Sequence, residues 1–135
     1  MSTLMSTLQV SAAGLTAQRT RLDTTASNIA NIQTTRGPDG GPYKRQDPVF
    51  EAVELGQGAT MVRVSGIEAD QSPPRLVYDP VHPDANPEGY VAMPNINLVE
   101  EMVNMITAQR AYEANAASID TTRKMARSAI AIGES

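Results

Sequence analysis

The sequence predicts a mainly α-helical protein with a small β-rich insert, in which long N- and C-terminal helices pair as an antiparallel coiled-coil hairpin. All nine prolines and seven of the nine glycines of this 135-residue chain lie within residues 37–94. Both ends are therefore free of the residue that most strongly interrupts helices. Both ends also repeat apolar residues every seven positions, which is typical of paired helices.

Residues 1–36 are expected to form one helix that ends near Thr34. One row recurs every seven residues at Leu8, Leu15, Leu22 and Ile29, and a weaker row that begins at Leu4 continues through Ser11, Gln18 and Thr25. On a helix such a repeat forms a continuous seam against a partner helix.

The side chains of residues 1–36 are unusually small and uncharged. Twenty of these residues are Ser, Thr, Ala, Gly or Asn, and only four are charged. A helix that faces water normally carries many charged residues, whereas small neutral side chains cost little to bury. We therefore expect this helix to be enclosed on more than one side. Because one chain supplies only one partner helix, the remaining neighbours are expected to come from other subunits.

Residues 37–94 are expected to hold short strands, a hairpin and proline-rich loops. The candidate strands are residues 43–50, 60–67 and 75–78. A turn at residues 71–74 would let the last two pair as a hairpin. Residues 79–89 contain three prolines and are expected to form a stiff, extended connector.

Residues 95–135 are expected to form the second long helix. Asn95 or Asn97 is a candidate N-cap and Gly133 a candidate C-cap. Apolar residues recur at Leu98, Met105, Tyr112, Ile119 and Ala126, with a partner row that includes Met102 and Ala116. The candidate assembly seam of the two ends is thus Leu4, Leu8, Leu15, Leu22, Ile29, Leu98, Met102, Met105, Tyr112, Ala116, Ile119 and Ala126.

Composition excludes several function classes. The formal net charge is −4, divided as +2, −5 and −1 among residues 1–36, 37–94 and 95–135, which disfavours a nucleic-acid partner. The chain has no cysteine, so thiolate metal sites and cysteine nucleophiles are ruled out. No apolar run exceeds four residues, which is too short to span a membrane, and we expect no ordinary signal peptide.

No residue set predicts catalysis, a cofactor or a metal. His82 is the only histidine, and its place between Val81 and Pro83 favours a turn or packing role. Residues 84–89 faintly resemble a calcium loop but lack its final bidentate Glu, and residues 37–44 lack the ending of a phosphate-binding loop. We therefore expect no enzymatic activity.

The heptad pattern alone leaves two architectures open. The helices could form an ordinary hairpin, as in a cytoplasmic adaptor or an export chaperone, or they could be the packing elements of a polymer subunit. The low charge of residues 1–36 favours assembly, and a chaperone hairpin needs no proline-rich insert.

Two motifs near the N-terminus carry a family resemblance. The runs SAAGLTAQ at residues 11–18 and SNIANIQT at 27–34 resemble the N-terminal signature of bacterial flagellar axial proteins, which form the rod and hook. Further runs resemble the members that form the proximal rod: DGGPYKRQ at 39–46, YDPVHPD at 78–84, GYVAMPN at 89–95 and EEMVNMITAQRAYEAN at 100–115. The motif residues singled out are Asn28, Asn31, Gly40, Gly41, Pro42, Tyr43, Tyr112 and Asn115, whereas Gln33 and Arg123 depart from the pattern.

The resemblance implies an inner helical domain built from residues 1–36 and 95–135, and a β-rich outer domain from residues 37–94. It implies a structural subunit of the proximal rod in the flagellar basal body, which crosses the periplasm, polymerises through its coiled-coil ends and transmits torque. The implied partners are copies of the chain itself, the rod subunits FlgB and FlgF, the FliE adaptor and the flagellar type III export apparatus, with no nucleic acid and no membrane span. Export without a cleaved signal is implied as well.

Overall fold

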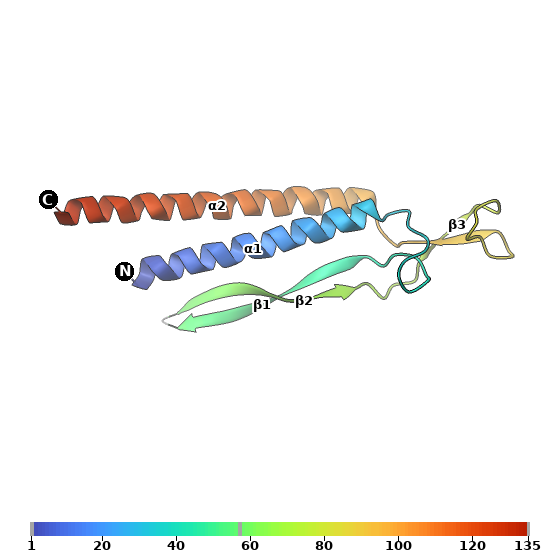
Figure 1. Cartoon of the computed structure of the whole chain (residues 1–135), viewed down its shortest axis with the longest axis horizontal. Helices are drawn as coiled ribbons and strands as arrows, with labels where there is room; N and C mark the ends of the chain where they lie inside the picture. Colours follow the sequence, from blue (N-terminus) through green and yellow to red (C-terminus); the bar gives the residue numbers. More distant parts are fainter. Residues whose placement is uncertain (1, 57, 135) are drawn as a thin grey trace.

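The computed structural model describes residues 2–56 and 58–134. In chain order the elements are α1 (Ser2–Ala30), β1 (Gln46–Gly56), β2 (Ala59–Ala69), β3 (Arg75–Tyr78), β4 (Tyr90–Met93) and α2 (Leu98–Glu134). The two helices run antiparallel, side by side, with the β1–β2 hairpin along the other side of α1 and the β3–β4 hairpin at the end away from the termini (Figure 1). The predicted mostly helical fold with a small antiparallel insert is confirmed.

Helix α1 lies between two neighbours of its own chain. One neighbour is α2 and the other is the β1–β2 hairpin. Val10 lies beside the hairpin tip and Asn28 bonds to the start of β1, so the buried Ala17 and Thr24 between them share the hairpin-facing side. The expectation that every further neighbour of α1 comes from another subunit is therefore wrong, because the insert supplies one of them.

Strands β1 and β2 pair antiparallel over eleven residues each. Gly56 and Gly58 at the turn have φ values of 86° and 80°, a backbone region that only glycine adopts without cost. The predicted pairing of residues 60–67 with 75–78 is wrong, since the partner of β2 is β1. Strand β1 also begins later than the predicted residue 43 and continues beyond residue 50.

Strands β3 and β4 form a second, smaller hairpin. Strand β4 was not predicted, and residues 79–89 that precede it fold into successive turns and not into an extended connector. The Asp79 N–H donates to the Gly89 carbonyl at 2.9 Å and closes the loop. Inside it, the Asn86 side-chain oxygen accepts from the backbone N–H groups of Glu88 and Tyr90 at 3.0 and 2.9 Å. Asx turns of this kind supply local bonds that bend the chain.

The ends of the helices follow the cap chemistry in part. The Asn97 side-chain oxygen accepts from the Val99 and Glu100 N–H groups at 3.0 and 3.3 Å, so Asn97 is the N-cap of α2. Gly133 is not a C-cap, because α2 continues to Glu134. Helix α1 ends at Ala30, earlier than the expected Thr34.

The interior is small and polar. The buried apolar side chains among the described residues include Ala17, Val91, Ile96 and Ala108, while Thr24, Thr25, Asn28, Glu101 and Thr122 are buried polar or charged residues. A compact 14.4 kDa monomer exposes about 6,800 Å², whereas this chain exposes 9025 Å². Much of the surface of the chain is therefore not covered by other parts of the same chain. No helix in the described part of the chain has the length and hydropathy to cross a membrane.

Gly89 provides a test of the β3–β4 loop. Its φ is 92°, and a Cβ there would lie 2.8 Å from Cε2 of Tyr78, whose ring packs edge-on against Tyr90 at 5.3 Å. We expect Gly89→Ala to lower the free energy of unfolding by about 2 kcal/mol, since backbone strain and a steric clash act together. Urea denaturation measures this. Gly66→Ala is the control, because a Cβ at Gly66 meets open space, and an equal effect of the two changes would contradict the prediction.

Candidate functional site

The candidate site is the contact between α1 and α2, where most of the predicted seam residues meet. On α1, the predicted positions Leu4, Leu8, Leu15, Leu22 and Ile29 are all half-buried. On α2, Met105, Tyr112, Ile119 and Ala126 are half-buried, and Leu98 at the start of the helix is exposed. All of these predicted positions except Leu98 are therefore partly covered within the chain.

The second predicted row of α2 lies outside the intrachain contact. Met102 and Ala116 are exposed, whereas the positions one residue earlier are covered: Asn115 lies close to Gly14 of α1, and Glu101 is buried and bonded to Arg45 of the insert. Glu101, Ala108 and Thr122 of that row are buried, although two of the three are polar. The apolar residues predicted that the row through Met102 would be buried, but the row through Glu101 is the buried one. A role of Met102 and Ala116 in assembly stays a prediction.

The middle of the seam is held by polar groups. The Ser11 and Ser118 hydroxyls lie 3.2 Å apart, and the Arg21 guanidinium donates to Asn104 Oδ1 at 3.1 Å. A Cβ on Gly14 would lie 2.8 Å from Oδ1 of Asn115, so the helices approach closely there. Polar residues in a helix seam fix its register at a cost in stability.

The seam becomes apolar toward the chain termini. A groove of about 230 Å³ opens there between the helices, lined by Leu4, Met5, Leu8, Ala126, Ala129 and Ile130. It brings the predicted residues Leu4, Leu8 and Ala126 together.

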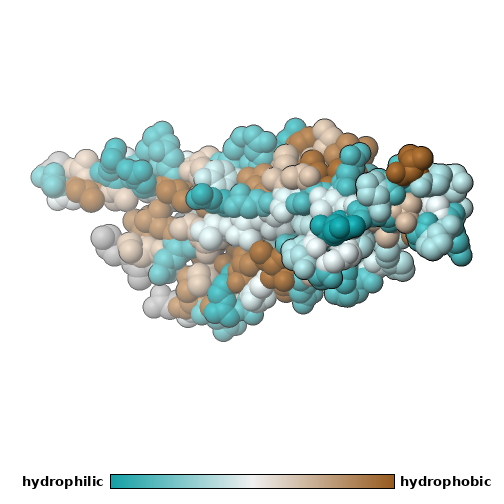
Figure 2. Space-filling model, turned by 45° about the vertical axis from the view of Figure 1, so that its right-hand side comes forward, coloured by the Kyte–Doolittle hydropathy of each residue, from teal (hydrophilic) through white to brown (hydrophobic). Residues whose placement is uncertain are grey.

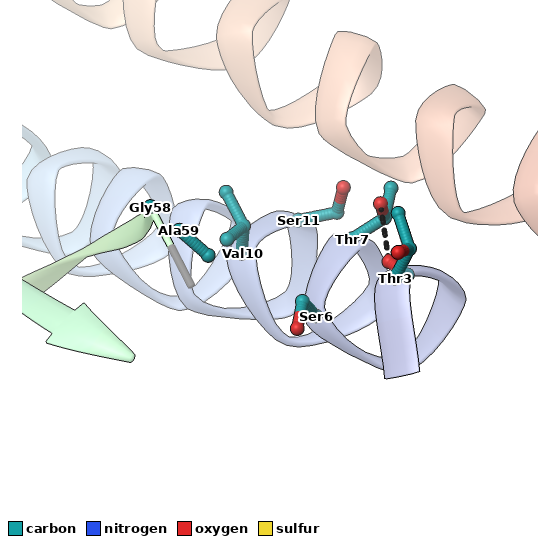
Figure 3. Close-up of a pocket in the computed structure, with 7 residues that line it drawn as sticks. All are labelled: Thr3, Ser6, Thr7, Val10, Ser11, Gly58 and Ala59. Atoms are coloured by element: carbon teal, nitrogen blue, oxygen red, sulfur yellow. Dashed lines mark hydrogen bonds between the residues drawn. The ribbon is translucent and has the colours of Figure 1, made fainter. Parts of the chain in front are cut away.

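A second cleft, of about 340 Å³, separates the N-terminal end of α1 from the hairpin tip (Figure 3). Its described lining residues are Thr3, Ser6, Thr7, Val10, Ser11, Gly58 and Ala59. The Thr7 hydroxyl donates to the Thr3 carbonyl at 2.8 Å, within the helix itself. These residues supply no acid, base or charged group, so this cleft has no chemistry beyond weak hydrogen bonding.

Asn28 joins the last turn of α1 to the first residue of β1. It is only 1% exposed. Its Nδ2 donates to the Gln46 carbonyl at 2.9 Å, and its Oδ1 accepts from the Gln46 N–H at 2.9 Å and from the Tyr43 hydroxyl at 2.8 Å. Ser27 Oγ lies 3.2 Å from the same Tyr43 hydroxyl. Asn28 therefore pairs with Gln46 as a neighbouring strand would.

The other N-terminal motif residues shape the turn that follows α1. Asn31 Nδ2 donates to the Ser27 carbonyl at 2.8 Å, and Asn31 Oδ1 accepts from the Thr34 hydroxyl at 3.0 Å. Gly40 has a φ of 86°. Gly41 and Pro42 complete the turn that leads to Tyr43. These motif residues set the path of the chain between α1 and β1.

An ion-pair cluster that the sequence did not reveal ties the insert to α2. The Arg45 guanidinium donates to Glu101 Oε1 and, at 2.7 Å, to Asp47. Burial alone would lower the pKa of Arg45, but the hydrogen bonds and charges of Asp47 and Glu101 raise it above its ordinary value. Glu101 is 1% exposed. Its position in the first turn of α2 also places its carboxylate at the positive end of the helix dipole.

A second polar link holds the β3–β4 loop to the segment that follows α1. Asp84 accepts from the Thr35 hydroxyl at 2.6 Å and from the Arg36 guanidinium. These two hydrogen bonds hold the pKa of Asp84 below its ordinary value. The Asp84 N–H donates to His82 Nδ1 at 3.0 Å, so the single histidine serves a turn, as predicted. The described residues contain no cluster of three or more His, Cys, Asp or Glu that could hold a metal ion.

Comparison with known proteins places both ends of the chain in flagellar families. Residues 8–38 match the family described as "Flagella basal body rod protein", and residues 88–132 match "Flagellar basal body rod FlgEFG protein C-terminal". The chain is 48% identical to the flagellar basal-body rod protein FlgC of Borreliella burgdorferi, over 96% of this chain and 97% of that protein. It is 44% identical to FlgC of Aquifex aeolicus over 93% of both, and 38% identical to FlgC of Salmonella typhimurium over 97% and 98%.

Replacing Asn28 tests its bridging role. We expect Asn28→Ala to lower the free energy of unfolding by about 2–4 kcal/mol, because buried groups of Gln46 and Tyr43 lose their partner. Ser27→Ala is the control, since it removes a single longer contact, and about 1 kcal/mol or less is expected. Urea denaturation followed by circular dichroism compares the two, and equal losses would argue against the bridge.

The link at Asp84 predicts a dependence on pH. Its lowered pKa means that the stabilisation is fully present above the unfolded-state value of about 3.9 and is lost as pH falls through the folded-state value. We expect the chain to be more stable than Asp84→Asn at pH 7, with the difference shrinking as the pH falls below about 3.9. Urea titrations across this range measure the difference. A gap that persists unchanged at pH 2 would show that ionisation of Asp84 is not its cause.

Proposed function

We propose, on the premise that this chain belongs to the FlgC family of flagellar basal-body rod proteins, that it is a structural subunit of the basal-body rod. The observation that carries this proposal is the 38–48% identity to FlgC proteins over nearly the whole of both chains. The elongated shape and the large exposed area support it, because a subunit enclosed by neighbours needs surface to give them (Figure 1). The role is mechanical and involves no catalysis.

The finer assignment concerns how the chain is divided. We propose that residues 1–36 and 95–135 form an inner helical domain and residues 37–94 an outer one. The antiparallel α1–α2 contact is then a coiled coil, which the seven-residue rows of α1 and the half-buried Met105, Tyr112 and Ile119 support.

The setting follows from the same premise. We propose that the chain occupies the proximal rod across the periplasm, polymerises through its helical ends and transmits torque. Its partners are then other copies, the rod subunits FlgB and FlgF, the FliE adaptor and the type III export apparatus, which exports it without a cleaved signal. Long helices in mutual contact form a stiff wall, since a helix keeps its backbone hydrogen bonds within itself. A helical-hairpin adaptor or export chaperone is not favoured, because the insert is folded against α1.

A charge in the seam tests assembly through the helical ends. Leu22 is half-buried where α1 meets α2, and Leu22→Asp would place an ionised carboxylate in that contact at a cost of several kcal/mol. We expect this variant to abolish rod assembly and swimming, as measured by basal-body purification and motility in soft agar. Leu22→Met is the matched control and should assemble, since it keeps volume and polarity. Normal swimming of Leu22→Asp would refute the role of the seam.

A further inference from the structure

The first turns of α2 expose a stripe of large apolar side chains. Val99, Met102, Val103 and Ile106 are 69%, 51%, 56% and 52% exposed. Their spacing places them on one side of the helix, opposite the buried Glu101 and Ala108. Figure 2 shows hydrophobic residues gathered on the upper surface where α2 begins. We call these four residues the α2 outer stripe.

Helix α1 exposes a stripe of a different kind. Thr16, Arg19, Asp23, Ala26 and Ala30 are all exposed and recur every three or four residues. They lie on the outward side of α1, away from both α2 and the hairpin. We call these five residues the α1 outer stripe. Its last two members are alanines, and they follow the oppositely charged Arg19 and Asp23.

We propose that the α1 outer stripe of one copy of this chain packs antiparallel against the α2 outer stripe of a second copy. This inference rests on the proposed function and names the neighbour of the helical ends. In this register, Ala26 faces Ile106 and Ala30 faces Met102. Two of the large side chains of one copy, Met102 and Ile106, thus meet alanines of the other, which favours close helix packing.

Charge fixes the register and the direction of the pairing. Continuing the antiparallel alignment beyond Ala26 places Arg19 opposite Glu113 and brings Asp23 beside Arg110, one residue from its exact partner position. All four are exposed, and none takes part in an ion pair among those found in the described part of the chain. A parallel alignment would not bring both pairs of opposite charges together. The second copy is therefore the occupant that matches the stripe in both size and charge.

The contact is heterologous, because each copy offers α1 on one side and α2 on another. Such contacts continue from copy to copy and close only as a ring or extend as a helix. Both arrangements are compatible with a wall of subunits around an axis.

Disulfide cross-linking tests the register, since the chain has no cysteine of its own. Two full-length variants, Ala26→Cys and Ile106→Cys, are produced together in a flagellated cell, and its purified basal bodies are oxidised. We expect a disulfide-linked mixed dimer on a non-reducing gel, and none when either variant is produced alone. Met125→Cys replaces Ile106→Cys in the control, because Met125 is 60% exposed on α2 outside the stripe, and it should give no dimer with Ala26→Cys.

Each alternative occupant gives a different result. Dimers of Ala26→Cys alone would indicate a two-fold contact and overturn the proposal, as would a bond from Ile106→Cys to another protein of the basal body. If both variants are present in basal bodies but form no mixed dimer, the proposed pairing is overturned, while the proposed rod function still stands. An unsubstituted chain that is absent from purified basal bodies would overturn the proposed function itself.

Charge reversal decides the matter independently of the cysteines. We expect Arg19→Glu and Glu113→Arg each to reduce the copies of the chain per basal body at least threefold, and the double variant to recover the original number. Lys44→Glu, which reverses an exposed charge in the loop before β1, should have no effect. Failure of the double variant to recover would overturn the proposal.

Discussion

The amide of Asn28 makes the same hydrogen bonds to Gln46 that a neighbouring strand would make, and the position of the insert depends on it. Because this pairing is buried, it holds the first residue of β1 against the last turn of α1. From that point the β1–β2 hairpin runs back along α1 and covers a second side of the helix (Figure 1). Arg45, one residue earlier, reaches Glu101 and ties the same junction to α2.

The enclosure of α1 explains its composition. A helix between another helix and a hairpin needs small side chains on both covered sides, and Gly14, Ala17 and Thr24 provide them. The contacts formed in this way are close but bury little apolar area. Hydrogen bonds and ion pairs therefore join its elements at several points, and large apolar side chains of α2 are left exposed. In a rod, such side chains lose their contact with water when they pack against neighbouring subunits.

The sequence predicted the helices and the α1 rows because proline position and heptad spacing are local signals. It also predicted β3 and named Asn97 as one of two candidates for the N-cap of α2. Strand pairing could not be predicted in the same way, because a turn at Gly56 and Gly58 competes with a turn at residues 71–74, and only tertiary contacts decide between them. The burial of Glu101 was missed for a related reason, because Glu101 is bonded to Arg45, which lies 56 residues away in the sequence. The small side chains of α1 indicated enclosure correctly but could not say that the insert supplies part of it.

The two helices differ in length, and this difference has a consequence for any stack of subunits. Helix α1 has 29 residues and α2 has 37, so α2 is about 12 Å longer at 1.5 Å per residue. The surplus turns project past α1 at the end that holds both termini, while the opposite end carries the β3–β4 hairpin (Figure 1). The molecule thus has a distinguishable top and bottom. In a column of such molecules that all point the same way, the column has the same orientation as each protomer. Its base and its growing tip therefore expose different parts of the chain.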